Sequence, residues 1–404
     1  MSALTEVSMQ QLSLFSVQEA YSECASCTAS NAELYDLVAA KMGWPPEALD
    51  KTEPVGRAGR PHSPLKRKIR WHQQTLKRLG ILERESRGKW KLAEPERGLH
   101  FVPAHMRLLG FSTKLGVALW AEATLFQDLD EPIHLCLTSP PYPLKKQRKY
   151  GNAAEKDWIQ FICKTLQPIV RNLVLGASLV LNVSNDIFLA RSPARSLYLE
   201  RLVLTLHDAL GLELMDRIPW INDSKPPGPT PWACVKRYQL AVSWEPILWF
   251  SNCPESVRSD NRRVLRPHSE KQRKLIAKGG EQRSRSFGDG AYSLRPGSFS
   301  AETPGSIPKN NLRIAHNCTD SRAIRKEAKR RNLPSHGAMF PTALADFFIR
   351  FLTEENELVV DPFAGAFKTC LAAERLGRRW IGTERVLEYV EQARDVPGAY
   401  SLEY

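Results

Sequence analysis

Two short segments hold residue types that could bind a flat base and a nucleoside cofactor. The first reads Thr138-Ser139-Pro140-Pro141-Tyr142, and the second, more than two hundred residues later, reads Asp361-Pro362-Phe363-Ala364-Gly365. The first combines a hydroxyl and an aromatic ring with two rigid prolines, so it suits a planar ligand. The second ends in a glycine, which lets the backbone pass close to a bound nucleoside.

Each segment follows an apolar run that predicts a buried parallel strand, residues 133–137 before the first and residues 357–360 before the second. In open α/β sheets, ligands bind at the carboxyl ends of such strands. Predicted strands alternate with predicted helices from about residue 100 onward. The predicted fold class is therefore α/β, with a Rossmann-like mixed sheet.

Residues 361–384 have the layout of a nucleoside-binding βαβ half. A helix is expected from about Thr369, and a second strand over residues 380–382 leads to Glu384. Glu384 lies nineteen residues after Gly365 and could accept hydrogen bonds from both hydroxyls of a ribose. The usual G-x-G pattern is absent, because Ala366-Phe367-Lys368 follows Gly365.

With their flanking residues, the two segments resemble the motifs of the β-class S-adenosylmethionine-dependent DNA amino-methyltransferases, in which the catalytic segment precedes the cofactor segment. The resemblance covers roughly residues 100–250 and 335–395, and it includes His336-Gly337-Ala338-Met339-Phe340-Pro341. The family motif typically continues with Ser-Gly-Thr-Thr or Ser-Asn-Thr-Thr, and this chain departs from it at residues 366–368. The resemblance implies S-adenosyl-L-methionine as the cofactor. The cofactor-binding residues that it implies are Phe340, Asp361, Pro362, Phe363, Ala364, Gly365, Thr369 and Glu384.

The same resemblance implies that Ser139, Pro140, Pro141 and Tyr142 are catalytic. Serine in the first motif position is characteristic of the enzymes that methylate cytosine N4. An exocyclic amine is a poor nucleophile, so hydrogen bonds to the Ser139 hydroxyl and the Pro140 carbonyl would align its lone pair with the transferred methyl group. Tyr142 would stack on a base that is flipped out of the duplex.

The predicted function is site-specific cytosine-N4 methylation of double-stranded DNA, in a restriction-modification setting. Adenine-N6 methylation is the nearest alternative. A second alternative is a non-catalytic DNA-binding protein with a degenerate methyltransferase fold, which the departure at residues 366–368 suggests. RNA methylation is a lesser option, because single-stranded substrates also suit an open base pocket.

Positive charge is concentrated in two regions of the 404-residue chain. The net charge is +13 overall, +11 over residues 253–335 and +10 over residues 51–92, which leaves −8 for the remainder. Two basic regions on an acidic body favour a nucleic acid as partner, although either could be an ordinary solvated surface. Residues 253–335 form a basic insert where β-class enzymes place their target-recognition region, and residues 279–310 could instead be a disordered tether. The predicted DNA-binding residues are Lys66, Arg67, Arg70, Lys145, Lys146, Arg262, Arg263 and Arg266, and residues 325–331 add a basic helical face.

The N-terminal part predicts a small separate module. Residues 1–29 are expected to be a flexible leader. Ser30 and Glu33 have capping-box spacing, a helix begins at Ser63-Pro64, and a hairpin turns at Arg87-Gly88. Residues 30–95 are therefore similar to the winged-helix N-terminal domain of the Mrr-type restriction endonucleases, although a protein-contact or dimerisation domain remains open. The other predicted units are a catalytic half (100–252), the basic insert (253–335) and a cofactor-binding half (336–404).

Composition narrows the remaining properties. No apolar run approaches the roughly 20 residues that a membrane helix needs, and a cytoplasmic protein without a membrane partner is the default expectation. Cys24 and Cys27 form the one C-x-x-C pair among eight cysteines, which favours reduced thiols over a zinc site, and no metal is predicted. Arg237 and Glu245 are expected to form an internal ion pair without a catalytic role. The predicted partners are double-stranded DNA and a possible cognate restriction endonuclease, and the chain is expected to be a monomer or a weak dimer.

Overall fold

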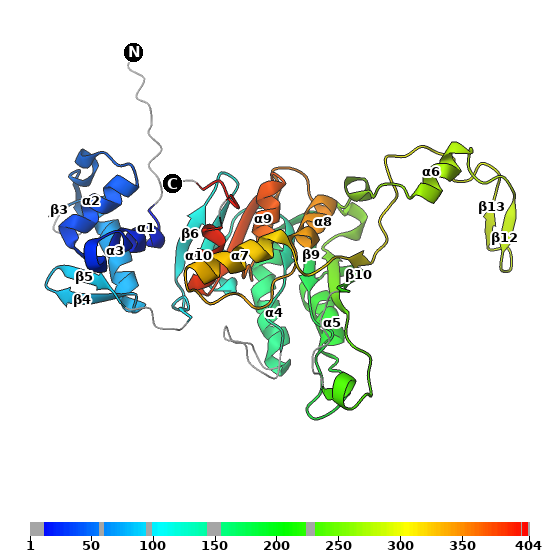
Figure 1. The fold of residues 1–404 in the computed structure, drawn as a ribbon, viewed down its shortest axis with the longest axis horizontal. Coiled ribbons are helices and arrows are strands. Elements are labelled where there is room, and N and C mark those ends of the chain that lie inside the picture. The colour runs from blue at the N-terminus through cyan, green and yellow to red at the C-terminus, as the bar shows by residue number, and fades with distance from the viewer. Residues whose placement is uncertain are drawn as a thin grey trace, which may run out of the picture.

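The computed structural model describes residues 12–55, 60–93, 99–143, 155–223, 231–396 and 398–402. A central sheet flanked by helices lies between a small N-terminal module at one end of the long axis and the tip of the insert at the other (Figure 1). No helix in these ranges is both long and apolar enough to cross a membrane.

The central sheet has nine strands in the order β14-β10-β11-β9-β8-β15-β16-β7-β6. The five strands from β9 to β7 in this order are mutually parallel, whereas β11 and β6 run antiparallel to their neighbours β9 and β7. This mixed sheet confirms the predicted α/β class. The strands are β6 Arg107–Ser112, β7 Gly116–Ala121, β8 Ile133–Thr138, β9 Leu173–Asn182, β10 Glu213–Ile221, β11 Trp244–Ser251, β14 Leu312–Arg313, β15 Leu358–Asp361 and β16 Arg379–Glu384.

Strands β8 and β15 are neighbours in the middle of the sheet, where Leu135 pairs with Val359 and Cys136 with Val360. From β8 the chain continues to β9 on one side, and from β15 it continues to β16 on the other. The order of the strands therefore reverses between β8 and β15. Open α/β sheets bind ligands at the carboxyl ends of the strands at such a switch point.

Helices cover both faces of the sheet (Figure 1). The apolar stripe of α4 (Glu155–Arg171), formed by Trp158, Ile162 and Leu166, is fully buried against one face together with α5 (Tyr198–Leu210). The other face is covered by α8 (Thr342–Leu352), α9 (Lys368–Arg375) and α10 (Leu387–Arg394). Burial on both faces explains why the central strands are continuous apolar runs rather than alternating ones.

The N-terminal module contains the predicted helices and hairpin. Helix α2 begins with the Ser30–Glu33 capping box, helix α3 is capped by Ser63, and the hairpin pairs as expected. Its helices are α1 Leu14–Ser22, α2 Asn31–Lys41 and α3 Pro64–Arg78, and its strands are β1 Thr28–Ser30, β2 Glu53–Val55, β3 Arg60–His62, β4 Leu82–Ser86 and β5 Lys89–Leu92.

The expectation of a flexible leader is wrong for residues 12–29, and residues 1–11 lie outside the described part of the chain. Helix α1 buries Leu14, Phe15 and Val17, and β1 pairs with β5. The buried Gln73 amide of α3 donates to the Tyr21 hydroxyl over 2.6 Å. Helix α1 is nine residues long, which is too short for apolar periodicity to stand out in the sequence.

The insert is only partly separate from the catalytic fold. Helix α6 (Glu270–Ala277) and the hairpin of β12 (Arg285–Phe287) and β13 (Tyr292–Leu294) extend away from the body (Figure 1). The structure thus contains a hairpin within residues 279–310, for which a disordered tether was the alternative. In contrast, β14 pairs with β10 in the central sheet, and α7 (Thr319–Arg330) packs against α10.

Candidate active site

The two signature segments meet at the carboxyl ends of β8 and β15, as their strands predicted. The Thr138 hydroxyl donates to the Asp361 carboxylate over 2.6 Å, and the backbone N–H of Phe363 donates to the same oxygen over 3.1 Å. Thr138 and Asp361 are both buried. Burial raises the pKa of Asp361 to about 6, although the hydrogen bonds from Thr138, Thr369 and Phe363 oppose the rise.

The segment that follows β8 places the Ser139 hydroxyl in a polar cluster. Its oxygen lies 3.2 Å from the Tyr142 hydroxyl and 3.4 Å from Oδ1 of Asn182. The Trp158 indole donates to the carbonyl of Pro141 over 2.5 Å, which ties the turn to α4. The four predicted catalytic residues, Ser139 to Tyr142, therefore lie together at the switch point. They lie next to Asn182, which the sequence prediction omitted.

Asn182 and Glu245 complete this cluster, and neither was predicted as a site residue. The Tyr142 hydroxyl lies 3.3 Å from Oδ1 of Asn182 and 3.4 Å from Oε2 of Glu245, and the Asn182 amide lies 3.3 Å from the same Glu245 oxygen. Asn182 is a buried polar residue at the carboxyl end of β9, so the reasoning that selected Ser139 could have found it. Glu245 reaches this edge because β11 is antiparallel to β9 and therefore begins where β9 ends.

The segment after β15 forms a tight turn held against the end of β16. The N–H of Ala364 donates to the carbonyl of Thr383 over 2.9 Å, and the Thr383 hydroxyl donates to the carbonyl of Pro362 over 2.8 Å. Gly365 has φ +52°, and a Cβ at this position would lie 3.0 Å from Nε2 of His336. Glycine is therefore favoured here both by the left-handed backbone and by the close approach of His336.

The Glu384 carboxylate lies beside this turn and is almost fully buried. It accepts the N–H of Gly365 over 2.9 Å and the N–H of Val386 over 2.8 Å. Burial raises the pKa of Glu384 to about 7, although the hydrogen bonds from Val386 and Gly365 oppose the rise. A glycine turn beside a buried carboxylate fits the ribose end of a nucleoside.

The other predicted cofactor residues line the same region. The buried Thr369 hydroxyl at the start of α9 lies 3.4 Å from the carbonyl of Leu137, which precedes the catalytic turn. The ring of Phe363 lies 5.8 Å from the ring of Phe161 on α4, and Phe340 is half-buried just before α8.

The departure at Ala366-Phe367-Lys368 directs its large side chains into the protein interior. Phe367 is fully buried with φ +55°, and its ring lies 5.7 Å from that of Phe111. Lys368 is 2% exposed, and its ammonium donates to Ser321 and Thr342 on neighbouring helices. Because both side chains pack into the protein interior, this departure from the family motif is compatible with the turn at Gly365.

Helix α3 carries the predicted DNA-binding residues of the N-terminal module. Arg67 is exposed, Arg70 is half-buried, and Lys66 pairs with Asp50 over 3.0 Å. The outward face of the helix presents Arg67, Trp71, Gln74 and Arg78 at positions i, i+4, i+7 and i+11. The predictions for Lys145 and Lys146 lie outside the described residues.

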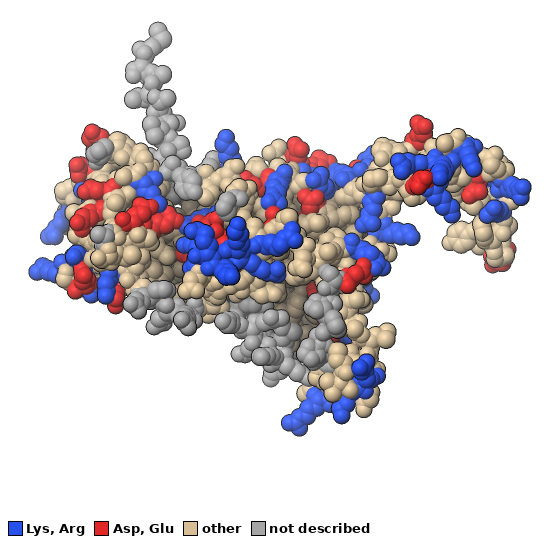
Figure 2. Space-filling view, viewed as in Figure 1, with Lys and Arg blue, Asp and Glu red and all other residues tan. Residues whose placement is uncertain are grey.

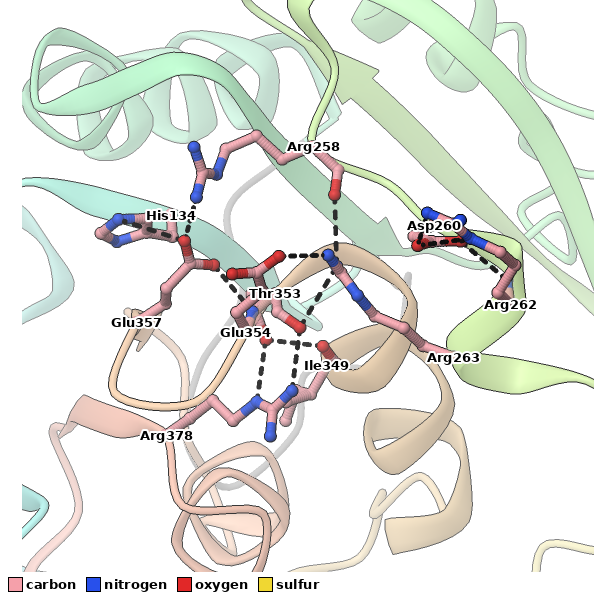
Figure 3. A network of polar contacts seen from close by, with 10 residues as sticks. All are labelled: His134, Arg258, Asp260, Arg262, Arg263, Ile349, Thr353, Glu354, Glu357 and Arg378. Carbon is pink, nitrogen blue, oxygen red and sulfur yellow. Dashed lines mark hydrogen bonds and ion pairs between the residues drawn. The ribbon is translucent and has the colours of Figure 1, made fainter.

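The structure places Arg262 and Arg263 away from the carboxyl ends of β8 and β15, where Ser139 and Gly365 lie. Arg263 donates to Glu354 over 2.6 Å, and Arg262 pairs with Asp260 over 2.7 Å (Figure 3). Glu354 precedes β15, so this contact belongs to the amino-terminal edge of the sheet. Arg266 is exposed at the base of the insert, where its backbone pairs with Ser306.

The same edge holds a wider ion-pair network that ties the root of the insert to the sheet (Figure 3). Glu357 pairs with Arg258, and Nε2 of His134 lies 3.6 Å from the same carboxylate oxygen. Burial lowers the pKa of His134, although the Glu357 carboxylate acts in the opposite direction.

The predicted basic face over residues 325–331 is only partly free. Arg330 pairs with Glu327, and Arg331 pairs with Asp395, the residue that follows α10. The residues on the outward face of α7 that remain exposed without an ion pair among the described residues are Arg322, Lys326 and Lys329. Figure 2 shows Lys and Arg side chains gathered over this helix.

The described residues contain no group of three or more His, Cys, Asp or Glu side chains that could hold a metal ion. All eight cysteines are free thiols, including Cys24 and Cys27.

Two family models match the chain. The model N6_N4_Mtase, described as DNA methylase, matches residues 133–395, and the model of the Mrr N-terminal domain matches residues 19–100.

Individual relatives agree with these matches. The type II methyltransferase M.PvuII of Proteus hauseri is 33% identical over 261 residues, which cover 65% of this chain and 76% of that protein. The type II methyltransferase M.BglII of Bacillus subtilis is 23% identical over 269 residues, which cover 66% of this chain and 64% of that protein. The solved structure named PvuII DNA methyltransferase (cytosine-N4-specific) superposes with a TM-score of 0.56 at 26% identity, covering 71% of this chain and 87% of that one.

Proposed function

Because the chain belongs to the DNA methylase family, we propose that it transfers a methyl group from S-adenosyl-L-methionine to the N4 amine of cytosine in double-stranded DNA. The observation that carries this proposal is the juxtaposition of Ser139 with the Gly365 turn at one switch point, through the Thr138–Asp361 hydrogen bond. The similarity to M.PvuII supports cytosine N4 as the target and restriction-modification as the setting.

Ser139 and the backbone next to it would orient the target amine. The Ser139 hydroxyl would accept a hydrogen bond from one N–H of the amine, and the Pro140 carbonyl would accept the other. Since the carbonyl of Pro141 already accepts from Trp158, the turn is held in place before the base arrives. Fixed acceptors of this kind speed the reaction by alignment rather than by strong acid–base catalysis.

Asn182 and Glu245 would assist Ser139 and Tyr142. The Tyr142 ring offers a surface on which a flipped base can stack. Its hydroxyl lies 3.4 Å from the Glu245 carboxylate, which could receive through Tyr142 the proton that the amine loses after methylation. Asn182 bridges Ser139 and Glu245 and would hold both in position.

The cofactor supplies, when bound, a sulfonium-activated methyl group. The turn at Gly365 would admit its nucleoside part, and the Glu384 carboxylate would exchange its backbone partners for the ribose hydroxyls. Thr369 and Phe340 would line the same site.

The DNA would be held by the two basic regions of the chain, residues 51–92 and 253–335. Arg67 and Arg70 on α3 would contact the duplex as a recognition helix does, and Lys326 on α7 would contact phosphates near the catalytic domain. Arg266 would contact the DNA from the insert.

The test is to incubate the protein with plasmid DNA and tritiated S-adenosylmethionine and then to identify the labelled nucleoside. Ser139→Ala serves as the catalytic variant and Ser22→Ala, at an exposed position of α1, as the matched control. Label in N4-methylcytosine that only Ser139→Ala abolishes supports the proposal. Label in N6-methyladenine refutes the choice of base, and absence of label despite cofactor binding refutes DNA methylation of this plasmid.

A further inference from the structure

Three helices begin close together, beside the turn at Gly365. Cys318 caps α7, and Thr342 and Lys368 are the first residues of α8 and α9. The Lys368 ammonium lies 3.1 Å from the sulfur of Cys318, 2.9 Å from the Ser321 hydroxyl and 3.2 Å from the Thr342 hydroxyl. Lys368 is 2% exposed, and a buried ammonium requires a nearby negative charge.

Cys318 is in direct contact with this ammonium and can supply that charge. The neighbouring Asp320 carboxylate is engaged by Arg375, which donates to both of its oxygens over 3.0 and 2.9 Å. Arg325 also faces Lys368 and adds positive charge. The charged groups around the thiol are therefore Lys368, Asp320, Arg325 and Arg375.

The Cys318 sulfur also faces the donors at the start of α7. It lies 3.4 Å from the N–H and 3.2 Å from the hydroxyl of Ser321. Helix N-termini and nearby cations stabilise thiolates. Burial would raise the pKa of Cys318, but hydrogen bonds from Ser321, Thr342 and Lys368 outweigh burial and lower the pKa to about 6. The residue as a whole is half-buried, so labelling by a small reagent tests whether its sulfur can be reached.

We propose that Cys318 is a modification site for soft electrophiles and peroxides, held as a thiolate by Lys368 and the α7 N-terminus. With iodoacetamide, the sulfur would attack the methylene carbon, a C–S bond would form, and iodide would leave. With hydrogen peroxide, the sulfur would attack one oxygen, the O–O bond would break, and hydroxide would leave. The product is a sulfenic acid, in which the sulfur is oxidised by two electrons. Each product removes the negative charge from beside Lys368.

Loss of this charge would loosen α7 from α9, which begins three residues after Gly365. Modification of Cys318 would therefore affect the position of the turn at Gly365, and with it the binding of the cofactor. This coupling rests on the proposed function, whereas the reactivity of Cys318 does not depend on it.

The first experiment measures iodoacetamide labelling of each cysteine by peptide mass spectrometry between pH 5 and 9. The expected labelling of Cys318 has a midpoint near pH 6, and at pH 6 its rate exceeds that of an ordinary thiol about tenfold, after allowance for the lower nucleophilicity of a low-pKa sulfur. The half-buried Cys163 and Cys234 provide the comparison within the same chain. A midpoint near 8.5, the ordinary value for a thiol, would overturn the proposal.

Two variants separate the role of Lys368 from general damage. Lys368→Met should move the midpoint upward, and Ser321→Ala should move it in the same direction while retaining the ammonium. Unchanged midpoints in folded variants would overturn the assigned cause.

Cofactor binding tests the coupling. Alkylation should weaken S-adenosylmethionine binding in the parent protein but not in Cys318→Ser. A low midpoint with unchanged cofactor binding would keep the modification site and refute the coupling. Absence of cofactor binding before alkylation would contradict the proposed function instead.

Discussion

Thr138 and Asp361 join the catalytic and cofactor segments through one buried hydrogen bond of 2.6 Å. Each residue is the last of its strand, and the two strands pair in parallel. On the proposed function, this contact would therefore help to set the distance between the reacting base and the cofactor. A displacement of either turn would separate groups that must meet for methyl transfer.

Replacement of Thr138 by valine should test this link, because valine keeps the shape but cannot donate a hydrogen bond. We expect the free energy of unfolding to fall by about 1–3 kcal/mol, since the buried Asp361 loses a donor. Urea unfolding measures the change. Thr205→Val is the control, because the Thr205 hydroxyl donates only to Arg201 within its own helix. Equal stability of the two variants would contradict the importance of the link.

Cofactor binding should depend on pH through Glu384, whose pKa is raised from an ordinary value of 4.5 to about 7. Ribose hydroxyls donate to the ionised carboxylate, so affinity for S-adenosylmethionine should fall about tenfold between pH 8 and pH 6. The stability of the free protein has the opposite dependence. Because the folded state holds this proton more tightly than the unfolded state, the contribution of Glu384 to stability decreases as pH rises from about 4.5 to about 7. Calorimetric titration should show a pH-independent and weaker affinity in Glu384→Gln, and an unchanged pH profile would exclude Glu384.

Arg263 and Glu354 should act as a structural pair. Each single alanine substitution should lower stability, and a double-mutant cycle should give a coupling of about 0.5 kcal/mol, because the Glu354 side chain is 64% exposed. DNA affinity should stay unchanged in Arg263→Ala. A loss of DNA affinity with a smaller salt dependence would instead support the sequence prediction that Arg263 contacts DNA.

The exposed face of α7 should bind phosphates. Lys326→Glu should weaken binding to duplex DNA uniformly across sequences and lower the salt slope by about one. Lys114→Glu makes the same charge change in the exposed turn before β7, at the amino-terminal edge of the sheet. Filter-binding titrations at several salt concentrations distinguish the two, and similar losses in both variants would indicate a non-specific effect of charge.

The sequence predicted the central fold because its strands are buried on both faces. The apolar runs before Ser139 and Asp361 correspond to β8 and β15. The parallel direction of these strands follows from the alternation of strands and helices along the chain. Strands β6, β7, β10 and β14 were not predicted. The side chains of β6 and β10 are only partly buried, so their apolar patterns are weak.

The candidate site was predicted at the ends of the parallel strands β8, β15 and β16, whereas Asn182 at the end of parallel β9 and Glu245 on antiparallel β11 were missed. Ser139 and Gly365 follow parallel strands, so their meeting could be inferred from the order of the chain. Glu245 is the second residue of β11, and its approach to Tyr142 depends on the pairing of β11 with β9. A single sequence does not show which strand pairs with which, or in which register.

The adjacency of β8 and β15 also has a consequence for how the protein folds. The hydrogen bond from the Leu358 backbone N–H to Nδ1 of His134 spans 224 residues, so the two central strands can pair only after most of the chain has been synthesised. Contacts of such high sequence separation slow folding. Until β15 arrives, one edge of β8 is an unpaired apolar strand that could pair with another chain. We therefore expect the yield of soluble protein to depend more strongly on synthesis rate and chaperone supply than the stability of the finished sheet would suggest.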